Sequence, residues 1–463
     1  MNDPNGLLFH QGTWHLFFQY YPHGMTWGPM HWGHATSQDL MTWQEQEIAL
    51  EPDALGMIFS GSAVIDLHNT SGLGADGTAP WVAIFTHHDG EAEKAGRIER
   101  EHQSLAYSLD EGRTWQKYAG NPVLPNPGTQ DLRDPKVFWH ASTRRWVMSL
   151  ASGDHIAFYT SPNLKDWTLQ SRFGHSAGAH GGVWECPDLI ELTLDGQQHW
   201  VLIVSLNPGG PNGGSATQYF VGAFDGTHFT PHDTQAQTHT RWLDHGPDNY
   251  AGVTWHNTAS RAVFIGWMSN WTYGRDLPTS PWRSAMTLPR ELSLQRVGNE
   301  VHLSNRPTPE VLQRLPSTPI ASSSLASDLL IPGDALRQTD GRFAIELNAP
   351  KLQDFTLTLS NDAGDALHIG YDVTSRSYWV DRSEAGQSDF HPEFAKRHTA
   401  PRISDAQEAQ ISLYFDCTSV ELFADNGLTS MTSLHFPRQP WSQWRILAAK
   451  AMHEGSVQLH SFE

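Results

Sequence analysis

The chain has 463 residues and a formal net charge of −20, with 30 Lys and Arg against 50 Asp and Glu. A surface this acidic repels phosphate backbones and anionic lipid headgroups, so we expect neither a nucleic-acid nor a membrane partner. Aromatic residues reach 11% and include 19 Trp, a composition that suits stacking on neutral ligands such as sugars. Cys186 and Cys417, the two cysteines, lie too far apart in sequence to suggest a disulfide framework or a Cys-x-x-Cys site.

The first predicted elements are five short strands in which aromatic and β-branched residues are closely spaced. Four carry Trp at the same point, and the successive gaps between Trp14, Trp81, Trp146 and Trp200 are 67, 65 and 54 residues. A second segment of a strand, an Asp or Asn turn and an aromatic residue follows each of the first four strands. The strands span residues 13–20, 80–86, 145–150, 199–205 and 261–267, and the second segments span 35–43, 106–115, 159–167 and 222–229.

A repeat of this long period is typical of propellers, which repeat a four-stranded sheet around an axis. We therefore predict an all-β fold with a five-bladed β-propeller over residues 1–293. An ordinary all-β sandwich with chance similarities among its strands is the alternative, and the two interleaved repeats argue against it. Ser, Pro and Thr accumulate after this region and predict a linker over 294–330. Alternating strands beyond it predict a β-sandwich domain over 331–463, for which we expect no catalysis.

Three of the innermost predicted strands open with a carboxylate, namely Asp3, Asp134 and Glu185. Each acid lies at a similar distance ahead of the next turn, so strands that line a central channel would bring all three to one mouth. Singly, each acid is explained by turn chemistry or by the start of a strand. Three acids at matching positions instead favour a catalytic cluster.

Carboxylates forced together separate in pKa, which gives one site both a nucleophile and an acid. The Trp-Glu-Cys-Pro sequence around Glu185 solvates charge poorly, so Glu185 is the candidate acid. Arg133 precedes Asp134 and is expected to hold it ionised where the two side chains meet. Asp3 is then the nucleophile, and carboxylates about 5 to 5.5 Å apart are the arrangement of retaining glycosidases.

Other signals are weaker. The Gly-rich segment 207–214 lacks the ending of a phosphate-binding loop, and we expect a flexible loop beside the site. None of the 26 His residues shows a metal-ligand spacing, so we expect no metal and no cofactor. The charged segment 91–101 is interpreted as a solvated excursion between strands.

At these residues the chain closely resembles glycoside hydrolase family 32, the invertases, levanases and inulinases. The similar motifs, in chain order, are Asn2-Asp3-Pro4-Asn5-Gly6, Phe59-Ser60-Gly61-Ser62, Arg133-Asp134-Pro135, Trp184-Glu185-Cys186-Pro187, Trp267-Met-Ser-Asn-Trp271 and the segment 282–292. The resemblance implies a five-bladed propeller followed by a β-sandwich. It also implies that Asp3 is the nucleophile, Glu185 the acid/base and Asp134 the residue that binds fructose hydroxyls at the transition state. The residues implied to shape the fructosyl pocket are Asn2, Gln19, Trp27, Phe59, Ser60, Arg133 and Trp271.

Segment 207–214, together with Thr-Ser-Pro-Trp-Arg at 279–283, is most similar to exo-acting fructan β-fructosidases. We therefore predict a retaining exo-glycosidase that hydrolyses terminal β-D-fructofuranosyl residues of levan, inulin and sucrose, so its partners are neutral fructose-containing saccharides. A blind pocket closed by segments 207–214 and 91–101 and by Trp271 would make the action exo. The alternatives are an endo-levanase or a fructosyltransferase of the same family, or a non-catalytic fructan-binding propeller.

The location of the protein is left open by the N-terminal residues 1–6, which have neither the basic nor the apolar region of a signal peptide. Family members usually carry further residues before the first motif. Secretion of a processed or longer chain is therefore slightly favoured over a cytoplasmic location.

Overall fold

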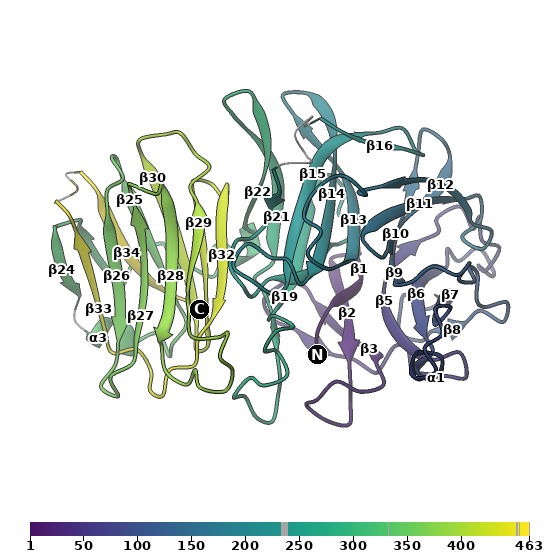
Figure 1. The fold of residues 1–463 in the computed structure, drawn as a ribbon, viewed down its shortest axis with the longest axis horizontal. Coiled ribbons are helices and arrows are strands. Elements are labelled where there is room, and N and C mark those ends of the chain that lie inside the picture. The colour runs from purple at the N-terminus through teal and green to yellow at the C-terminus, as the bar shows by residue number, and fades with distance from the viewer. Residues whose placement is uncertain (233–238, 332, 451, 453, 463) are drawn as a thin grey trace.

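The structure of the chain is a computed structural model that describes residues 1–232, 239–331, 333–450, 452 and 454–462. It is an all-β fold of antiparallel sheets (Figure 1). The helices in the described ranges are short, namely α1 (Gly90–Lys94), α2 (Pro309–Leu312) and α3 (Gly333–Arg337). None of these described helices is long and apolar enough to cross a membrane.

Within the described residues, the chain up to Pro307 forms five sheets, and the main path of each sheet follows the chain order. The first sheet contains β1 (Pro4–His10), β2 (Thr13–Tyr20), β3 (His31–Ser37) and β4 (Gln44–Glu45). The second contains β5 (Met57–Ile65), β6 (Trp81–His88), β7 (Glu101–Ser108) and β8 (Gln116–Lys117). The third contains β9 (Leu132–His140), β10 (Arg145–Ser152), β11 (His155–Ser161) and β12 (Thr168–Phe173).

The fourth sheet contains β13 (Val183–Leu194), β14 (Gln197–Asn207), β15 (Ala216–Phe224), β16 (Phe229–Pro231) and β17 (Arg241–Trp242). The fifth contains β18 (Tyr250–Thr254), β19 (Ala262–Met268), β20 (Ala285–Met286), β21 (Arg290–Val297) and β22 (Glu300–Pro307). The five strands that the sequence repeats are each the second strand of a sheet. Many of their aromatic and β-branched residues are buried in the cores between sheets, which is why these strands share a composition.

The first strands of the five sheets contact one another in a closed ring. β1 contacts β5, β5 contacts β9, β9 contacts β13, β13 contacts β18, and β18 contacts β1. The labels of β1, β5, β9 and β13 lie near one another in Figure 1. Backbone hydrogen bonds of 3.0 Å from Phe9 N–H to His256 O and from His256 N–H to Leu7 O join the last sheet to the first. The five first strands therefore surround a common axis.

The remaining strands form two six-stranded sheets that share one hydrophobic core. One sheet contains, in order, β23 (Ala321–Ser324), β34 (Ser456–Ser461), β25 (Phe343–Ala349), β30 (Ala409–Asp416), β31 (Ser419–Ala424) and β32 (Thr429–Leu434). The other contains, in order, β24 (Asp328–Ile331), β33 (Gln443–Ala448), β26 (Phe355–Ser360), β27 (Ala366–Asp372), β28 (Ser377–Glu384) and β29 (Arg397–Pro401). These sheets are stacked at one end of the molecule (Figure 1).

The segment predicted as a linker, 294–330, differs in the structure. β21 and β22 form a hairpin that completes the fifth sheet up to Pro307, and β23 and β24 already belong to the six-stranded sheets. The Ser-rich composition misled the prediction because β23 is an edge strand, where polar side chains face water. The connection between the two sets of sheets is therefore short, from 308 to 320.

Buried ion pairs join the two sets of sheets. Fully buried Arg290 on β21 donates to Glu421 Oε2 on β31 at 2.6 Å and to Asp244 Oδ2 at 2.8 Å. Fully buried Arg382 on β28 donates to Asp248 Oδ2 at 2.6 Å. Because such charges are stable in the interior only while paired, the pairs fix how the six-stranded sheets sit on the ring.

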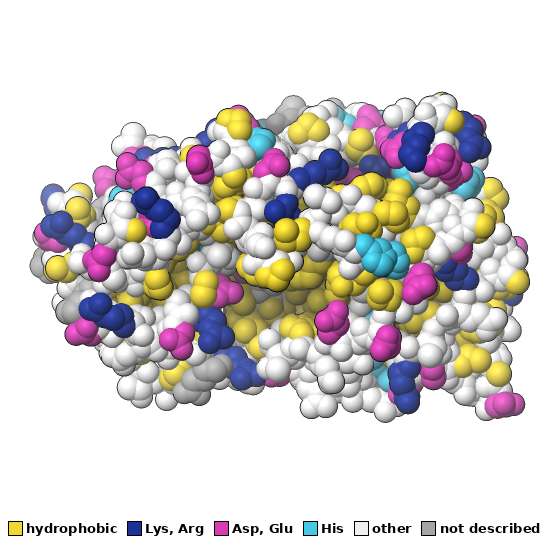
Figure 2. Space-filling model, turned by 90° about the horizontal axis from the view of Figure 1, so that it is seen from below, with side chains coloured by type: hydrophobic (Ala, Val, Ile, Leu, Met, Phe, Trp, Pro, Cys, Tyr) yellow, Lys and Arg dark blue, Asp and Glu magenta, His cyan; other side chains and the backbone are white. Residues whose placement is uncertain are grey.

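The acidic charge is dispersed on the face that Figure 2 shows, where Asp and Glu alternate with Lys and Arg. Hydrophobic side chains line a hollow near the middle of this face.

Candidate active site

Each first strand of the ring carries an irregularity near its start. The register of β1 against β2 shifts between Asn5 and Leu8, that of β13 against β14 shifts between Glu185 and Asp188, and β5, β9 and β18 carry equivalent shifts. The backbone adopts positive φ at Asp134 (63°) and Cys186 (45°), a conformation that is uncommon for residues other than glycine. Bulges of this kind re-aim side chains, so the first strands turn their opening residues toward one end of the shared axis.

A cavity of about 530 Å³ lies at that end. It brings together all ten residues that the sequence singled out: Asn2, Asp3, Gln19, Trp27, Phe59, Ser60, Arg133, Asp134, Glu185 and Trp271. Its other lining residues are His88, Glu93, Arg100, Glu101, Asp131, Asn207 and Arg275.

Asp3 is held by short polar contacts from the preceding residue and from β5. Asn2 Nδ2 donates to Asp3 Oδ1 and Ser60 Oγ donates to Asp3 Oδ2, both at 2.9 Å. The backbone of Asp3 is paired as well, since its carbonyl accepts from Gln19 N–H at 2.9 Å. Burial raises the pKa of Asp3, the nearby Glu185 raises it further, and the two hydrogen bonds oppose this rise. One carboxylate oxygen of Asp3 therefore stays fixed beside the hydroxyl of Ser60.

Asp134 is the most deeply buried of the three acids. Its Oδ2 accepts from the backbone N–H of Cys186 at 3.0 Å, and its own N–H donates to Thr86 Oγ1 at 3.1 Å. Burial, together with repulsion from the other two carboxylates, raises the pKa of Asp134 to about 7 although Arg133 opposes the rise. The expectation that Arg133 would hold Asp134 ionised is therefore wrong.

Arg133 instead binds Glu185. Its Nε and Nη2 both donate to Glu185 Oε1, at 3.1 and 3.0 Å, and so fix the position of that oxygen. The hydroxyl of Tyr250 donates to the other oxygen, Oε2. Trp184, which was expected to surround Glu185 with poorly solvating groups, is buried in the core and donates its Nε1 to Ala179 O at 2.9 Å. The surroundings of the Glu185 carboxylate are thus polar.

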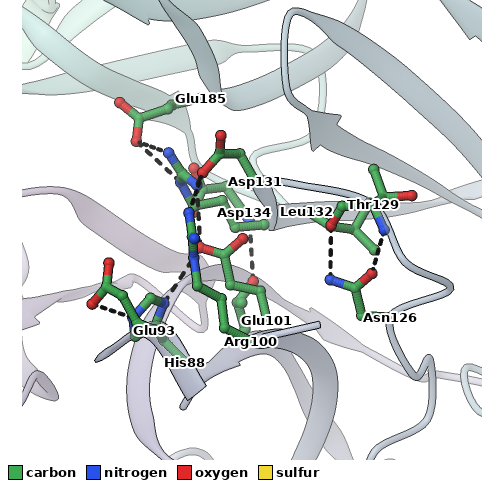
Figure 3. Close-up of polar contacts among 12 residues, drawn as sticks. His88, Glu93, Arg100, Glu101, Asn126, Thr129, Asp131, Leu132, Asp134 and Glu185 are labelled. Carbon is green, nitrogen blue, oxygen red and sulfur yellow. Dashed lines mark hydrogen bonds and ion pairs between the residues drawn. The ribbon is translucent and has the colours of Figure 1, made fainter. Parts of the chain in front are cut away.

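Glu101, Asp131 and Glu185 belong to a network of charged contacts (Figure 3), and Arg133 pairs with all three. Arg133 Nη1 also donates to Glu101 Oε1 at 3.1 Å and to Asp131 Oδ1 at 2.9 Å. Glu101 is only 1% exposed and contacts His88 Nδ1 at 3.4 Å. The segment 91–101, which was predicted to be solvated, therefore ends in a buried acid. The pairing of Glu101 with His88 across β6 and β7 could not be predicted from the sequence.

Aromatic side chains form the rim of the cavity. Phe59 stacks on His88 with ring centroids 4.3 Å apart, and Trp27 meets the Phe59 ring edge-on at 6.1 Å. Trp27 is 38% exposed, so part of its side chain is accessible to a ligand. On the other wall, Trp271 packs on Trp267 at 4.8 Å and lies under the guanidinium of Arg275 at 5.9 Å.

Unused polar atoms point to a hydroxyl-rich ligand. Gln19 is 2% exposed, and its Nε2 is buried without a hydrogen-bond partner among the described residues. A buried amide donor is costly unless something accepts from it. Because Gln19 and Asn207 both line the cavity, the site offers uncharged donors and acceptors beside its carboxylates.

Comparison with protein families gives two consecutive matches. Residues 1–307 match the family model described as "Glycosyl hydrolases family 32 N-terminal domain", and residues 311–463 match the one described as "Glycosyl hydrolases family 32 C terminal".

Similar proteins and structures cover nearly the whole chain. The chain is 45% identical over 460 residues to a levanase of Bacillus subtilis, covering 97% of this chain and 66%, just under two thirds, of the levanase. It is 43% identical over 496 residues to an extracellular exo-inulinase of Aspergillus niger, covering 100% of this chain and 92% of that protein. The crystal structure of an exo-inulinase from Aspergillus awamori superposes with a TM-score of 0.91 at 37% identity, covering 100% of this chain and 96% of the other. A β-fructofuranosidase from Schwanniomyces occidentalis complexed with fructosyl-erythritol gives a TM-score of 0.85 at 31% identity, with coverage of 100% and 95%.

Proposed function

The chain belongs to glycoside hydrolase family 32, and from this premise we propose that it is an exo-acting β-fructosidase that releases terminal fructosyl units from levan, inulin and sucrose. The observation that carries the proposal is the convergence of Asp3, Asp134 and Glu185 on one cavity whose free polar atoms suit sugar hydroxyls. Levanase and exo-inulinase relatives at 45% and 43% identity support the substrate class. The extracellular location in the name of the second relative supports secretion for this chain.

In this proposal the five smaller sheets are the blades of a five-bladed propeller and the two six-stranded sheets are a β-sandwich. The ring of first strands supports this assignment, because a propeller places one strand of each blade at its axis. We place the domain boundary in the connection 308–320. The division of the family models between residues 307 and 311 supports that position.

Asp3 is proposed as the nucleophile. Its carboxylate attacks the anomeric carbon of the terminal fructose and forms an ester while the bond to the leaving oxygen breaks. Protonated Glu185 gives its proton to that oxygen. Glu185 then takes a proton from water, whose oxygen attacks the anomeric carbon and frees Asp3, so the configuration is retained.

Asp134 is proposed to bind fructose hydroxyls and to stabilise the transition state. Positive charge develops on the sugar ring in the oxocarbenium-like transition state, and a fixed negative group in a water-poor site stabilises it. The backbone N–H of Cys186 holds Asp134 in place at 3.0 Å, so its orientation needs no rearrangement during the reaction.

Arg133 and Tyr250 are proposed to orient Glu185. Arg133 and Tyr250 each bind one of its oxygens, so the proton travels to and from a carboxyl group of fixed position. Gln19, Asn2 and Ser60 would bind the fructosyl unit or orient the nucleophile, and Trp27, Phe59 and Trp271 would stack on the saccharide.

Exo action is supported by the walls of the cavity. Glu93 and Glu101 come from the segment 91–101, Asn207 opens the Gly-rich segment 207–214, and Trp271 lies in the connection between β19 and β20. These three walls are the ones expected to close a pocket for one terminal unit.

The test is an assay of products at early times on levan, inulin and sucrose. Free fructose as the first product from both polymers supports the proposal, whereas early oligomers would indicate an endo-acting enzyme. On sucrose, hydrolysis releases equal fructose and glucose, whereas a transferase leaves less free fructose than glucose. The Glu185→Gln variant is the control, and binding of fructan without any release by the unmodified protein would indicate a non-catalytic propeller.

A further inference from the structure

A cluster of histidines lies outside the cavity, on the third sheet and the segment that follows it. Asp154 lies in the tight turn between β10 and β11, and His155 begins β11. His175 and His180 lie in the segment 174–182, which joins β12 to β13. These two histidines lie 20 or more positions beyond His155, so no ligand spacing is visible in the sequence.

The ligand atoms of this cluster face one another. Those of Asp154, His155 and His175 all lie within 4.8 Å of one another. Asp154 Oδ1 is 3.4 Å from His155 Nδ1 and 3.8 Å from His175 Nδ1, and Asp154 Oδ2 is 3.7 Å from His180 Nδ1. Zinc–nitrogen bonds of about 2.0 to 2.1 Å in a tetrahedron place neighbouring ligands about 3.3 to 3.4 Å apart. The distances from Asp154 to the histidines are close to this spacing, and the other ligand atoms, which lie within 4.8 Å, would move together on binding an ion.

His180 is oriented so that its Nδ1 faces the carboxylate of Asp154. Its Nε2 lies 3.1 Å from the backbone carbonyl of Ala177 and donates to it, which leaves Nδ1 as the nitrogen that can bind a metal ion. A second nitrogen donating to a backbone carbonyl is also how metal-binding histidines are oriented.

His155 is the buried histidine of the cluster. It is 9% exposed, and its Nε2 is buried without a partner in the described part of the chain. Its Nδ1 faces Asp154, and its ring lies 4.0 Å from that of His175. The more exposed Asp154 and His175, with side chains 59% and 60% accessible, leave a path for an ion from solvent.

We propose that Asp154, His155 and His175, with His180 as a fourth ligand, form a binding site for a divalent transition-metal ion of the zinc class. Imidazole nitrogens and one carboxylate are donors that Zn²⁺, Ni²⁺ and Cu²⁺ accept, whereas Mg²⁺ and Ca²⁺ prefer oxygen ligands. The sequence analysis predicted no metal, because no histidine shows a metal-ligand spacing. The proposed ligands come together only in the folded chain, so their spacing in sequence does not indicate the site.

The site is connected to the strand that carries Glu185. Gly153 O, next to Asp154, accepts from Trp184 N–H at 2.7 Å, and Gly153 N–H donates to Asp131 O at 3.1 Å. A bound ion would tie the turn at Asp154 to the segment 174–182 and so stabilise the start of β13. The site lies outside the catalytic cavity and does not depend on the proposed β-fructosidase activity.

The test is Zn²⁺ titration of the chelator-treated full chain by calorimetry, with the thermal midpoint measured in parallel. We expect one Zn²⁺ per chain and a rise of the midpoint with Zn²⁺. His175→Ala and Asp154→Asn change exposed side chains, so both variants should fold, and each should weaken binding at least about 100-fold. His228→Ala removes an exposed histidine that also lies near an aspartate, Asp225, and should bind Zn²⁺ as the unmodified chain does.

Three results would overturn the proposal. They are no stoichiometric binding, equal affinity in all variants, or loss of affinity only in the His228→Ala control. Binding of Mg²⁺ or Ca²⁺ in preference to Zn²⁺ would also refute the ligand assignment. Fructose release is measured separately, and its failure leaves the Zn²⁺ result unaffected.

Discussion

Replacing Asp134 by Asn should stabilise the folded protein at alkaline pH while it lowers activity. Asp134 is buried beside two other carboxyl groups, and its pKa is raised from 3.8 to about 7. In the unfolded chain the group loses its proton near 3.8. Between these values the folded state keeps a proton that the unfolded chain has released, so stability falls as pH rises through this window.

The size of the effect follows from the shift. About three pKa units correspond to about 4 kcal/mol, the cost of ionising Asp134 in the folded state above pH 7. The asparagine side chain carries no charge, and its oxygen can still accept from Cys186 N–H. For a chain of 463 residues this cost corresponds to a change of about 4 °C in the thermal midpoint, or about 6 °C where only the first 307 residues unfold together.

Thermal unfolding of both proteins at pH 4 and pH 8 measures this effect. The midpoint of the Asp134→Asn variant relative to the unmodified chain should be about 4 to 6 °C higher at pH 8 than at pH 4. Asp362→Asn changes an exposed carboxyl in the turn before β27 and should show no such difference. A relative midpoint that is the same at both pH values would refute the reasoning, because it would mean that burial does not penalise the charge on Asp134.

Four further outcomes are expected. Asp3→Asn and Glu185→Gln should each lower kcat for fructose release at least about 100-fold, and a near-normal rate in either would remove its proposed role. Burial raises the pKa of Asp3, which must be ionised to attack, so kcat/KM should fall as pH falls through a midpoint above 3.8. Ser60→Ala removes a hydrogen bond that lowers this pKa and should move the acid limb of the profile to higher pH, and an unmoved limb would argue against Asp3 as the titrating group. Arg290→Ala leaves buried carboxylates unpaired and should cost about 3 to 5 kcal/mol of unfolding free energy, whereas Arg296→Ala, which breaks an exposed pair, should change it by less than about 1 kcal/mol in denaturant titrations.

The strands and the meeting of the three acids were predictable because both follow from a repeat. Once the Trp-bearing strands are recognised as equivalent, the strands before them are equivalent too, and residues at matching positions lie at one end of the ring. Asp3, Asp134 and Glu185 are separated by 131 and 51 positions in sequence, yet they line one cavity. No property of a single acid would have placed them there.

The partners of these acids were not predictable. Arg133 precedes Asp134, but neighbouring residues of a strand project to opposite sides, and the irregular backbone at Asp134 changes the direction again. The guanidinium consequently reaches Glu185, which lies 52 positions away on the next sheet. The contact between Glu101 and His88 could not be predicted either, since it depends on the register between two strands.

The charge balance of the cavity links its burial to its proposed chemistry. Six carboxyl groups and three guanidinium groups line it, so full ionisation would leave an excess of negative charge at the partly buried site. Raised pKa values at Asp3 and Asp134 show the cost of that excess in the empty site. A neutral saccharide does not relieve this cost, whereas a sugar ring that becomes positive at the transition state does. Repulsion among the carboxylates destabilises the empty cavity, and the same negative charge would stabilise the positive sugar ring at the transition state. The stability lost in the folded protein and the rate gained in the reaction would therefore have the same origin.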